Sequence, residues 1–471
     1  MTSKDFTIPI EELNKQKEYS SLVQTVLSSR FSDSKPKAFV HTYGCQGNVA
    51  DGEKLKGMLE EMGYCFTEKV EEADLVLYNT CAIREHAQDR VYGNVGALKQ
   101  IKEKNPDLII ALCGCMMQQE YVAERIKKSF RYVDLVFGTH VIYKLPEFIY
   151  KCLCTSQRVF EITDSDGNIV EGLPIHRDGK FKAWIPIMYG CNNFCSYCVV
   201  PYVRGRERSR DFNAVLNEAR ELIKKGYKEI TLLGQNVNSY NKDLDDKYSF
   251  PALLRAINDI EGDFIIRFMT SHPRDCTFEL LNAMAECKKV AKHLHLPFQS
   301  GNDRVLNEMN RHYDREKYLS LIDYAYKLMP DLSITSDVIV GFPGETYEEF
   351  CDTLSLIEKV RYTSLFTFIF SSRPGTKAAS MEDKISRKEK GEWFNELIGL
   401  QEKIAGERTA SMKNKIYRVL VEEEKENGVL TGRTEGNIII EFSGDKSLIG
   451  SFCNVKVTEP KTWILKGEIV G

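Results

Sequence analysis

Three cysteines within eight residues constrain this chain more than any other feature of its sequence. Cys191, Cys195 and Cys198 are separated by three residues and then by two, in a run that begins at Gly190. Three thiolates can hold three irons of a cubic [4Fe–4S] cluster, whereas a cluster used only for electron transfer normally takes four cysteines. The fourth iron is then open, as in metal sites that bind a ligand and act on it. The run therefore predicts a cluster that carries out chemistry.

Zinc and unligated thiols are the alternatives that this spacing leaves open. A structural zinc site takes four Cys or His ligands, usually in paired elements. Residues 199–210 contain no further Cys or His, so the open cluster is the favoured interpretation.

The cysteine content also indicates the compartment. Fourteen cysteines occur among 471 residues, and the chain starts with a polar segment that lacks an apolar signal core. This pattern is typical of reduced thiols used in metal or redox work, not of a disulfide framework. The chain has no run of about 18 apolar residues, so no membrane-spanning helix is expected. We expect a cytoplasmic protein.

The net charge of −4 does not indicate a nucleic-acid-binding protein, so a polyanionic partner would have to meet a local basic patch. Arg204, Arg206 and Arg208 follow the cysteine run, with Arg210 as a fourth. Arginine suits phosphate binding and base stacking, although a short charge run is more often a solvated or salt-bridged helix start. We treat Arg204, Arg206 and Arg208 as candidate substrate-binding residues.

Strands and helices are predicted to alternate between residues 36 and 147. The expected strands cover residues 38–43, 73–79 and 108–112, and helical patterns cover 51–62 and 89–104. Such alternation predicts a parallel sheet, in which sites form beyond the carboxyl ends of the strands. Cys45, Cys81 and Cys115 each follow one of these strands. We predict that they form a second three-thiolate cluster site.

Buried or incidental cysteines are the alternative for this second set, because a single Cys is often a small core residue. Recurrence at three strand ends favours ligation. Cys113 is a rival to Cys115, but Cys113 lies within the expected strand, whereas Cys115 follows the turn at Gly114. Cys152 and Cys154 form a Cys-x-Cys pair that is better explained by chance.

Six further strands are predicted between residues 181 and 405, and helical stretches such as 212–225 and 347–359 separate them. The strands cover residues 184–188, 229–233, 264–269, 293–296, 333–338 and 364–370. Six βα units predict an incomplete (β/α)6 version of a barrel that needs eight units when closed. The three-cysteine run follows the first strand, at the face where barrel enzymes place their sites.

The three-cysteine run resembles that of the radical S-adenosylmethionine (SAM) superfamily, in which the open iron binds SAM and one electron from the cluster cleaves it to a radical. This resemblance makes small and amide-bearing residues after the barrel strands candidates for SAM contact, although Gly and Pro also commonly end strands. The candidates are Gly234, Gln235, Asn236, Gln299, Ser300, Asp337 and Gly341.

The C-terminal residues change to short alternating strands at 416–422, 430–433, 437–441, 451–458 and 465–469. They predict a small β-barrel of a kind that often binds single-stranded or looped nucleic acid. The fold class is therefore α/β multidomain. We expect a helical extension over 1–35 (helix 11–27), a parallel-sheet α/β domain over 36–152, the barrel over 177–408 and the small β-barrel over 409–471.

Together these features resemble the radical SAM methylthiotransferase family over nearly the whole chain, with a C-terminal module like the TRAM domain. Four strings carry the likeness: Tyr-Gly-Cys-Gln at 43–46, Asn-Thr-Cys-Ala at 79–82, Cys-Val-Val-Pro-Tyr-Val-Arg-Gly at 198–205 and Leu-Pro-Phe-Gln-Ser-Gly at 296–301. They are most similar to the branch that adds a methylthio group at C2 of N6-(dimethylallyl)adenosine, next to the anticodon of tRNA. Gly47 departs from this branch, which often carries Met there.

The resemblance implies two [4Fe–4S] clusters and two SAM molecules. One SAM would methylate sulfur held at the auxiliary cluster on Cys45, Cys81 and Cys115, and the other would be cleaved at the second cluster to activate adenine C2. It also implies a tRNA anticodon stem-loop gripped by the C-terminal module, a target base that leaves its stack, an electron donor such as flavodoxin or ferredoxin, and a monomer. The sequence identifies neither the sulfur source nor the physiological reductant.

Two rival functions remain at this point. Related family members modify threonylcarbamoyladenosine in tRNA or an aspartate of a ribosomal protein, by the same chemistry. A non-catalytic iron–sulfur protein that binds RNA and senses redox state would explain the cysteines and the C-terminal module, but not an open iron inside a barrel.

Overall fold

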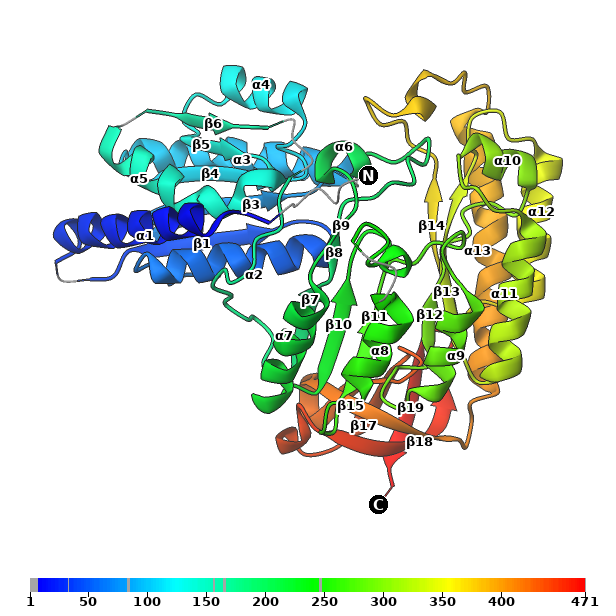
Figure 1. Ribbon diagram of the computed structural model, residues 1–471. Coiled ribbons are helices and arrows are strands. Elements are labelled where there is room, and N and C mark those ends of the chain that lie inside the picture. Colours follow the sequence, from blue (N-terminus) through cyan, green and yellow to red (C-terminus); the bar gives the residue numbers. More distant parts are fainter. Residues whose placement is uncertain are drawn as a thin grey trace. The chain divides into compact units, whose positions relative to one another are not determined.

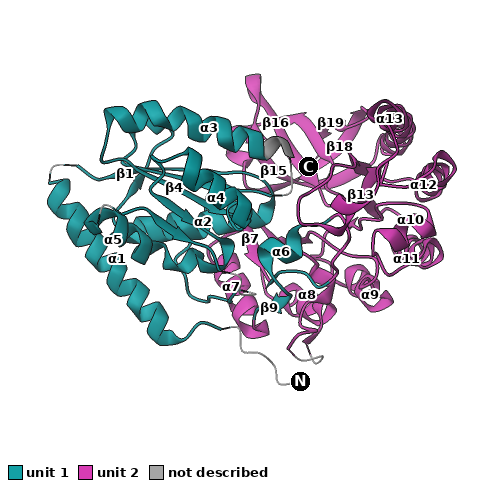
Figure 2. Ribbon diagram, turned by 90° about the horizontal axis from the view of Figure 1, so that it is seen from above, with its two compact units in different colours: residues 1–178, 188–192, 198–210 teal, residues 179–187, 193–197, 211–471 magenta. Residues whose placement is uncertain are grey.

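The chain forms two compact units, and each is described by itself. The computed structural model describes residues 7–32, 34–82, 85–155, 157–163, 167–244 and 248–470. The first unit comprises Met1–Asp178, Met188–Asn192 and Cys198–Arg210, and the second comprises Gly179–Ile187, Asn193–Tyr197 and Asp211–Gly471 (Figure 2). No helix in the described part of the chain is long and apolar enough to cross a membrane.

The first unit is built on a six-stranded parallel sheet of order β2-β1-β3-β4-β5-β6 (Figure 1). The strands are β1 (Lys37–Thr42), β2 (Cys65–Phe66), β3 (Leu75–Thr80), β4 (Ile109–Gly114), β5 (Leu135–Phe137) and β6 (Val159–Glu161). Every residue of β3 and β4 is buried, as expected for central strands covered on both faces. The three strands predicted from the sequence are β1, β3 and β4.

Five α-helices accompany this sheet: α1 (Ile10–Arg30), α2 (Gln46–Glu61), α3 (Glu85–Lys104), α4 (Glu120–Ser129) and α5 (Leu145–Thr155). The predicted helical extension is α1, but it belongs to the core of the first unit: its Val23 and Leu27 pack in one apolar cluster with Phe148 of α5. The sheet also continues to Glu161 in β6, past residue 152, where the α/β domain was expected to end. Residues 1–6 of the extension lie outside the described residues.

The second unit contains the six parallel strands predicted for the barrel. They are β7 (Lys182–Pro186), β10 (Glu229–Leu233), β11 (Ile265–Phe268), β12 (His293–His295), β13 (Ser333–Val340) and β14 (Ser364–Ile369). They pair as β7-β10-β11 and β12-β13-β14, and a parallel bridge between Ile266 and Val290 joins the two runs. The prediction of a partial barrel is thus confirmed.

Helices cover the outside of this partial barrel (Figure 1). They are α7 (Phe212–Lys224), α8 (Phe250–Asn258), α9 (Phe278–Glu286), α10 (Asp303–Glu308), α11 (Arg315–Leu328), α12 (Tyr347–Val360) and α13 (Arg387–Ala410). Local sequence fixes where they begin: Thr346 and Glu349 form a capping box at the start of α12, which satisfies backbone N–H groups that the helix itself leaves unpaired.

The C-terminal module of the second unit is a closed barrel of order β15-β16-β17-β19-β18. Its strands are β15 (Ile416–Glu424), β16 (Val429–Thr434), β17 (Ile439–Ser443), β18 (Phe452–Pro460) and β19 (Ile464–Ile469). Alternate residues such as Val419, Val421, Val455 and Val457 fill its core. The five predicted strands and the barrel form are confirmed.

The C-terminal module contacts the amino ends of the (β/α)6 strands, where the strands begin (Figure 1). Arg267 of β11 pairs with Glu229, the first residue of β10, at 2.7 Å and donates to the backbone oxygens of Thr434 and Glu435 at 2.8 and 2.9 Å. Lys182, the first residue of β7, pairs with Glu422 of β15. The module therefore lies at the opposite end of the strands from their carboxyl edge.

Replacing Arg267 with alanine should destabilise the protein by about 3–5 kcal/mol, because Glu229 would stay buried without its main partner. Urea unfolding measures this loss. Lys415→Ala is the matched control, since Lys415 also joins the module to the barrel but forms an exposed pair with Asp331 at 3.1 Å, worth less than about 1 kcal/mol. Equal losses for both variants would contradict the role given to Arg267.

Candidate functional site

The second cysteine set gathers at one edge of the first unit's sheet. Cys45 follows β1, Cys81 follows β3 and Cys115 follows β4, and these strands are neighbours in the order β1-β3-β4. Cys81 and Cys115 are buried, whereas Cys45 is half-buried. None of the fourteen cysteines, all of which lie in the described ranges, forms a disulfide.

Gly44 brings the backbone beside Cys45 directly against Cys81. Its φ is +105°, and a Cβ at this position would lie 2.4 Å from Cys81 Cβ and 2.6 Å from Cys81 Sγ. Only glycine tolerates both the left-handed backbone and the close approach. The Tyr-Gly-Cys string is therefore required for these two cysteines to lie together.

Asn48, near the start of α2, ties the three strand ends together. Its side-chain amide donates to the backbone oxygens of Tyr43 and Thr80, both at 2.9 Å, and its Oδ1 lies 3.6 Å from Cys115 Sγ. The side chain is completely buried. Asn48 therefore fixes the mutual position of the segments that carry Cys45, Cys81 and Cys115.

Charge at this cysteine set is balanced by one buried guanidinium. Burial raises the pKa of the Cys115 thiol to about 12, Arg204 opposes that rise, and negative charge on Cys81 and Cys45 adds to it. Arg204 Nε donates to Cys115 Sγ at 3.1 Å. Cys45 is the N-cap residue of α2. Burial thus favours the neutral Cys115 thiol, and Arg204 is the neighbour that favours its ionised form.

Cys113, the rival of Cys115, lies within β4 as expected. Its side chain packs in the apolar core with Ala111 and Phe137, and burial raises the pKa of its thiol well above the ordinary value. It therefore faces one side of the sheet, whereas Cys115 follows the strand end.

The described residues provide no preformed site for a single metal ion. Among the described residues, no three Cys, His, Asp or Glu side chains are arranged to hold one metal ion. A cubane distributes its ligands over separate irons, so its thiolates stand farther apart than the ligands of one ion.

The run of three cysteines contributes to both units. In the first unit, Gly190 has a φ of +76°, and a Cβ there would lie 2.0 Å from the backbone oxygen of Arg206. Cys191 N donates to Gly205 O at 3.1 Å, and Cys198 precedes α6 (Val200–Arg204). These contacts place residues 205–206 directly against Gly190 and Cys191, where the cysteine run begins.

In the second unit, Cys195 is held by the segment that follows α10. Arg311 is buried, and its Nη1 lies 3.4 Å from Cys195 Sγ while its Nη2 donates to Pro297 O at 2.6 Å. Ser196 N donates to Met309 O at 3.0 Å, and Asn310 donates to the backbone oxygens of Asn193 and Phe194. The cysteine is thereby tied to the loop after β12.

The candidate SAM-binding residues follow the barrel strands, with one difference. Gly234, Gln235 and Asn236 follow β10, Gln299 and Ser300 follow β12, and Gly341 follows β13. Asp337 lies inside β13, as it does in the predicted strand 333–338, and its carboxylate lies 3.6 Å from His295 Nε2.

Buried polar atoms without a hydrogen-bond partner collect at this carboxyl edge. Among the described residues, Asn236 Oδ1 and Gln299 Oε1 have no hydrogen-bond partner, nor have Ser271 Oγ and His272 Nε2 after β11. Such atoms are costly unless something satisfies them. The amine and hydroxyl groups of SAM can donate to the two amide oxygens, whereas His272 Nε2 offers a donor, because His272 Nδ1 accepts from Arg274 N at 3.2 Å. Sequence reasoning missed Ser271 and His272, although a polar pair directly after the third strand was a usable signal.

Backbone strain marks the same edge. Thr270 and Gln299 have φ values of +74° and +67°, a region that non-glycine residues rarely occupy and that clusters at functional sites. Backbone strain and these buried polar atoms together indicate a ligand site of the kind that SAM requires.

The turn at Gly341 makes a pH-dependent contribution to stability. Burial raises the pKa of Glu345 to about 7, although its carboxyl group accepts from Phe342 N and Gly341 N, at 3.1 and 2.8 Å, and Arg304 also opposes the rise. The folded state thus keeps a proton that the unfolded state releases near pH 4.5.

Stability from Glu345 is therefore complete below about pH 4.5 and is lost as pH rises through about 7. We expect the unfolding free energy to fall by up to about 3 kcal/mol over this window, and Glu345→Gln to remove that part of the slope. Urea unfolding at pH 5 and pH 8 measures it. Identical slopes in the two proteins would contradict the expectation.

The candidate substrate-binding arginines differ in exposure. Arg206 is exposed, whereas Arg204 and Arg208 are 7% and 3% exposed. Arg204 pairs with Asp51 at 2.7 Å, and Arg208 donates to the backbone oxygens of Arg206 and Arg204 at 2.7 and 3.1 Å. Only Arg206 of the three is thus placed to meet a large substrate in this structure.

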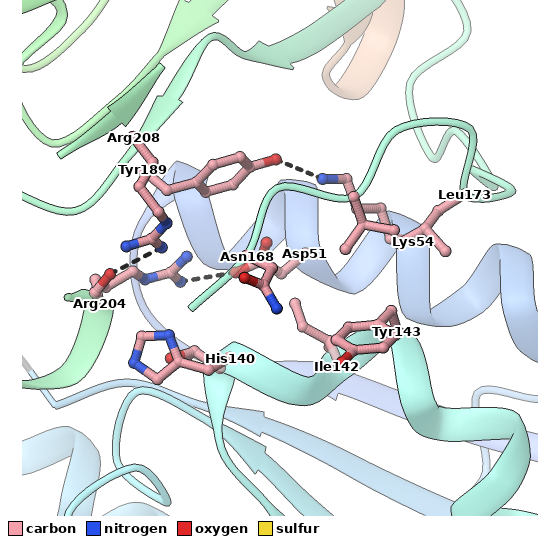
Figure 3. A pocket seen from close by; sticks show the side chains of 12 residues that line it. Asp51, Lys54, His140, Ile142, Tyr143, Asn168, Leu173, Tyr189, Arg204 and Arg208 are labelled. Carbon is pink, nitrogen blue, oxygen red and sulfur yellow. Dashed lines mark hydrogen bonds and ion pairs between the residues drawn. The ribbon is translucent and has the colours of Figure 1, made fainter. Parts of the chain in front are cut away.

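Arg204 and Arg208 line a polar cavity of about 40 Å³ in the first unit (Figure 3), with room for about three waters. Lys54 lines it from α2 and donates to Tyr189 Oη at 2.7 Å, and Asp51 and His140 complete its polar wall. The cavity thus has more cationic than anionic side chains.

Three known families match successive parts of the chain. Residues 37–138 match the Uncharacterized protein family UPF0004, residues 185–357 the Radical SAM superfamily and residues 410–470 the TRAM domain. The structure of the radical S-adenosylmethionine methyltransferase TsrM from Kitasatospora setae, with cobalamin and a [4Fe-4S] cluster bound, superposes with a TM-score of 0.55 at 14% identity, over 74% of this chain and 77% of that one. This likeness concerns the fold alone.

Curated relatives extend over the whole length. The chain is 50% identical over 465 residues to the tRNA-2-methylthio-N(6)-dimethylallyladenosine synthase of Thermoanaerobacter sp. (strain X514), a match that covers 98% of this chain and 97% of that protein. It is 48% identical over 472 residues to the protein of the same name from Clostridioides difficile (strain 630), which covers 99% of each chain.

Proposed function

Because the chain belongs to the tRNA-2-methylthio-N(6)-dimethylallyladenosine synthase family, we propose that its two cysteine sets hold two [4Fe–4S] clusters with separate tasks. The enzyme is a radical SAM tRNA methylthiotransferase that adds the methylthio group to N6-(dimethylallyl)adenosine at position 37. The gathering of Cys45, Cys81 and Cys115 around Asn48 is the observation that carries the two-cluster proposal.

The clusters and SAM supply the radical chemistry and the methylated sulfur that an unactivated C2–H bond requires. The residues of the chain hold these groups in place. Cys191, Cys195 and Cys198 would hold three irons of one cluster and leave the fourth for SAM, while Cys45, Cys81 and Cys115 would hold the auxiliary cluster beside Arg204.

The carboxyl edge of the barrel binds SAM. Gln299 and Asn236 present acceptors that have no protein partner in the described residues, and Ser271 and His272 extend this polar rim. Gly234, Gln235, Ser300 and Gly341 keep the backbone open to the ligand, and Asp337 orients His295. Water is excluded because these groups are buried or half-buried.

The anticodon stem-loop meets two parts of the chain. Exposed Arg206 of the first unit contacts its phosphates, and the C-terminal module of the second unit provides the other RNA contact. Lysines and arginines of the module are paired with acidic residues: Lys425 with Glu441, Lys446 with Glu424, Arg433 with Glu422, and Lys461 and Lys466 with Glu459. Trp463 is exposed and offers an aromatic ring on which an RNA base can stack.

The remaining partners follow from the chemistry. A one-electron donor such as flavodoxin or ferredoxin reduces the clusters, and the enzyme works as a cytoplasmic monomer. The division into a helical segment over 1–35, an auxiliary-cluster domain over 36–152, a radical SAM core over 177–408 and a TRAM domain over 409–471 is part of the proposal.

Two measurements test it. Nucleoside analysis of tRNA from a deletion strain should show loss of the 2-methylthio group and accumulation of N6-(dimethylallyl)adenosine. Iron and sulfide analysis of anaerobically reconstituted protein should give about eight irons, falling to about four when Cys191, Cys195 and Cys198 are all replaced by alanine.

Unchanged methylthiolation in the deletion strain would overturn the substrate assignment. Four irons in the wild type, all lost in the triple variant, would overturn the auxiliary cluster and leave Cys45, Cys81 and Cys115 as structural thiols.

A further inference from the structure

Arg204 makes four contacts in the first unit, three through its guanidinium and one through its backbone oxygen. Its Nε donates to Cys115 Sγ at 3.1 Å, and its Nη2 donates to Asn48 Oδ1 at 2.7 Å and pairs with Asp51 at 2.7 Å. Its backbone oxygen accepts from Arg208. Asn48 and Asp51 thus hold Nη2 of the guanidinium, while its Nε donates to the Cys115 sulfur.

The arginine reaches this place from a distant part of the sequence. It ends α6, which follows Cys198, and Val199 and Val203 pack around Cys115 with Ala82 in one small apolar cluster. Thr139 donates to the backbone oxygen of Val203 at 2.6 Å. The helix is therefore anchored to the first unit by packing as well as by the arginine.

The setting makes this hydrogen bond strong. Arg204 is 7% exposed and Asp51 is 3% exposed, and charge-assisted bonds gain strength where water is excluded. Hydrogen bonds to ligand sulfurs, together with burial and nearby charge, set the reduction potential of iron–sulfur clusters.

We propose that Arg204 is a positioning residue of the auxiliary cluster, which orients the Cys115 sulfur and raises the cluster's reduction potential. The inference rests on the proposed function, because it requires a cluster on Cys45, Cys81 and Cys115. The Nε–H donor stabilises the added electron on the sulfur of the reduced cluster, whereas Asp51 offsets the positive charge of Arg204. Removal of the donor therefore lowers the potential. The role differs from the substrate contact expected of this residue from the sequence.

The second unit repeats the arrangement independently. Arg311 is 4% exposed, and its Nη1 lies 3.4 Å from Cys195 Sγ. One buried arginine therefore faces one predicted ligand sulfur in each cysteine set.

The test uses the full-length chain with Cys191, Cys195 and Cys198 replaced by alanine, so that one cluster alone is observed. Arg204→Gln combined with Asp51→Asn removes the guanidinium without leaving a buried carboxylate unpaired. Arg204→Lys keeps the positive charge but loses the planar guanidinium, whose N–H donors point in fixed directions. Redox titration monitored by electron paramagnetic resonance gives the midpoint potential, and iron analysis gives the occupancy.

We expect the double variant to bind about four irons and to be about tenfold harder to reduce, a shift of about 59 mV for one electron. Arg204→Lys should restore part of the shift. Lys54→Met is the matched control, because Lys54 lines the same cavity and carries the same charge but bonds to Tyr189 and not to sulfur. The shift in midpoint potential of Lys54→Met should be less than half that of the double variant.

Three results would overturn the inference. Full iron occupancy with wild-type potentials in both Arg204 variants would show that the hydrogen bond does not act on the cluster. An equal shift in Lys54→Met would assign the effect to charge in general. Absence of iron from the parent triple-alanine protein would remove the auxiliary cluster itself, and the proposed function would fail with it.

Discussion

Replacing Cys81 with alanine should stop methylthio transfer to RNA while SAM cleavage continues. Cys81 is buried at the end of β3 and packs against Gly44, beside Cys45, so its loss removes one of three auxiliary ligands. We expect product formation to fall by more than about 100-fold, beyond the loss typical of a residue that only supports a ligand. Cleavage persists because it depends on the other cysteine set.

Two assays on one preparation check this expectation: 5′-deoxyadenosine released under strong reductant, and 2-methylthio nucleoside formed in RNA. Cys113→Ala is the matched control, since Cys113 is equally buried on the adjacent strand but packs in the apolar core. It should keep both activities and about eight irons. Methylthiolation by the Cys81 variant would disprove the auxiliary-ligand assignment.

Replacing Cys195 with alanine should abolish both activities. Cys195 is the central cysteine of the run, and Arg311 and the loop after β12 hold it in place. Without it, two thiolates remain for a cluster that needs three to leave a single open iron. 5′-Deoxyadenosine should fall to the level of the protein-free control, and iron content should fall by about half.

Cys287→Ala controls for the loss of a buried thiol in the same unit. Cys287 ends α9, is 3% exposed and has no predicted ligand role, so this variant should cleave SAM normally. Cleavage by the Cys195 variant, or loss of cleavage in the Cys287 variant, would disprove the assignment of the radical cluster.

Patterns that depend on near neighbours were predictable. Buried runs such as β3 and β4, each followed at once by a cysteine-bearing turn, predicted both the strand and the place where it ends. The barrel strands and the five strands of the C-terminal module carried equally local signals. The short strands β2, β5 and β6, of two or three residues each, carry too little periodicity to be recognised.

Features that depend on distant segments were not predictable. Arg204 meets Asn48 and Asp51 across more than 150 positions, and no spacing rule connects them. The charge run around Arg204 suggested substrate-binding residues, but the fold buries three of its four arginines, Arg204, Arg208 and Arg210, against protein acceptors. Helix α1 was recognised as a helix but not as part of the core, because Val23 and Leu27 form a narrow apolar stripe on a polar helix.

The two units interleave along the chain, which passes from one to the other five times. A gene fragment that stops at Asp178 would encode Cys45, Cys81 and Cys115 but omit Val199, Val203 and Arg204, which surround Cys115 in the first unit. The N-terminal region alone therefore lacks residues that its Cys115 site needs, and it cannot be moved to another protein by itself. A chimera of two relatives would have to carry residues 188–210 from the same parent as residues 37–161 to keep the Cys115 surroundings intact.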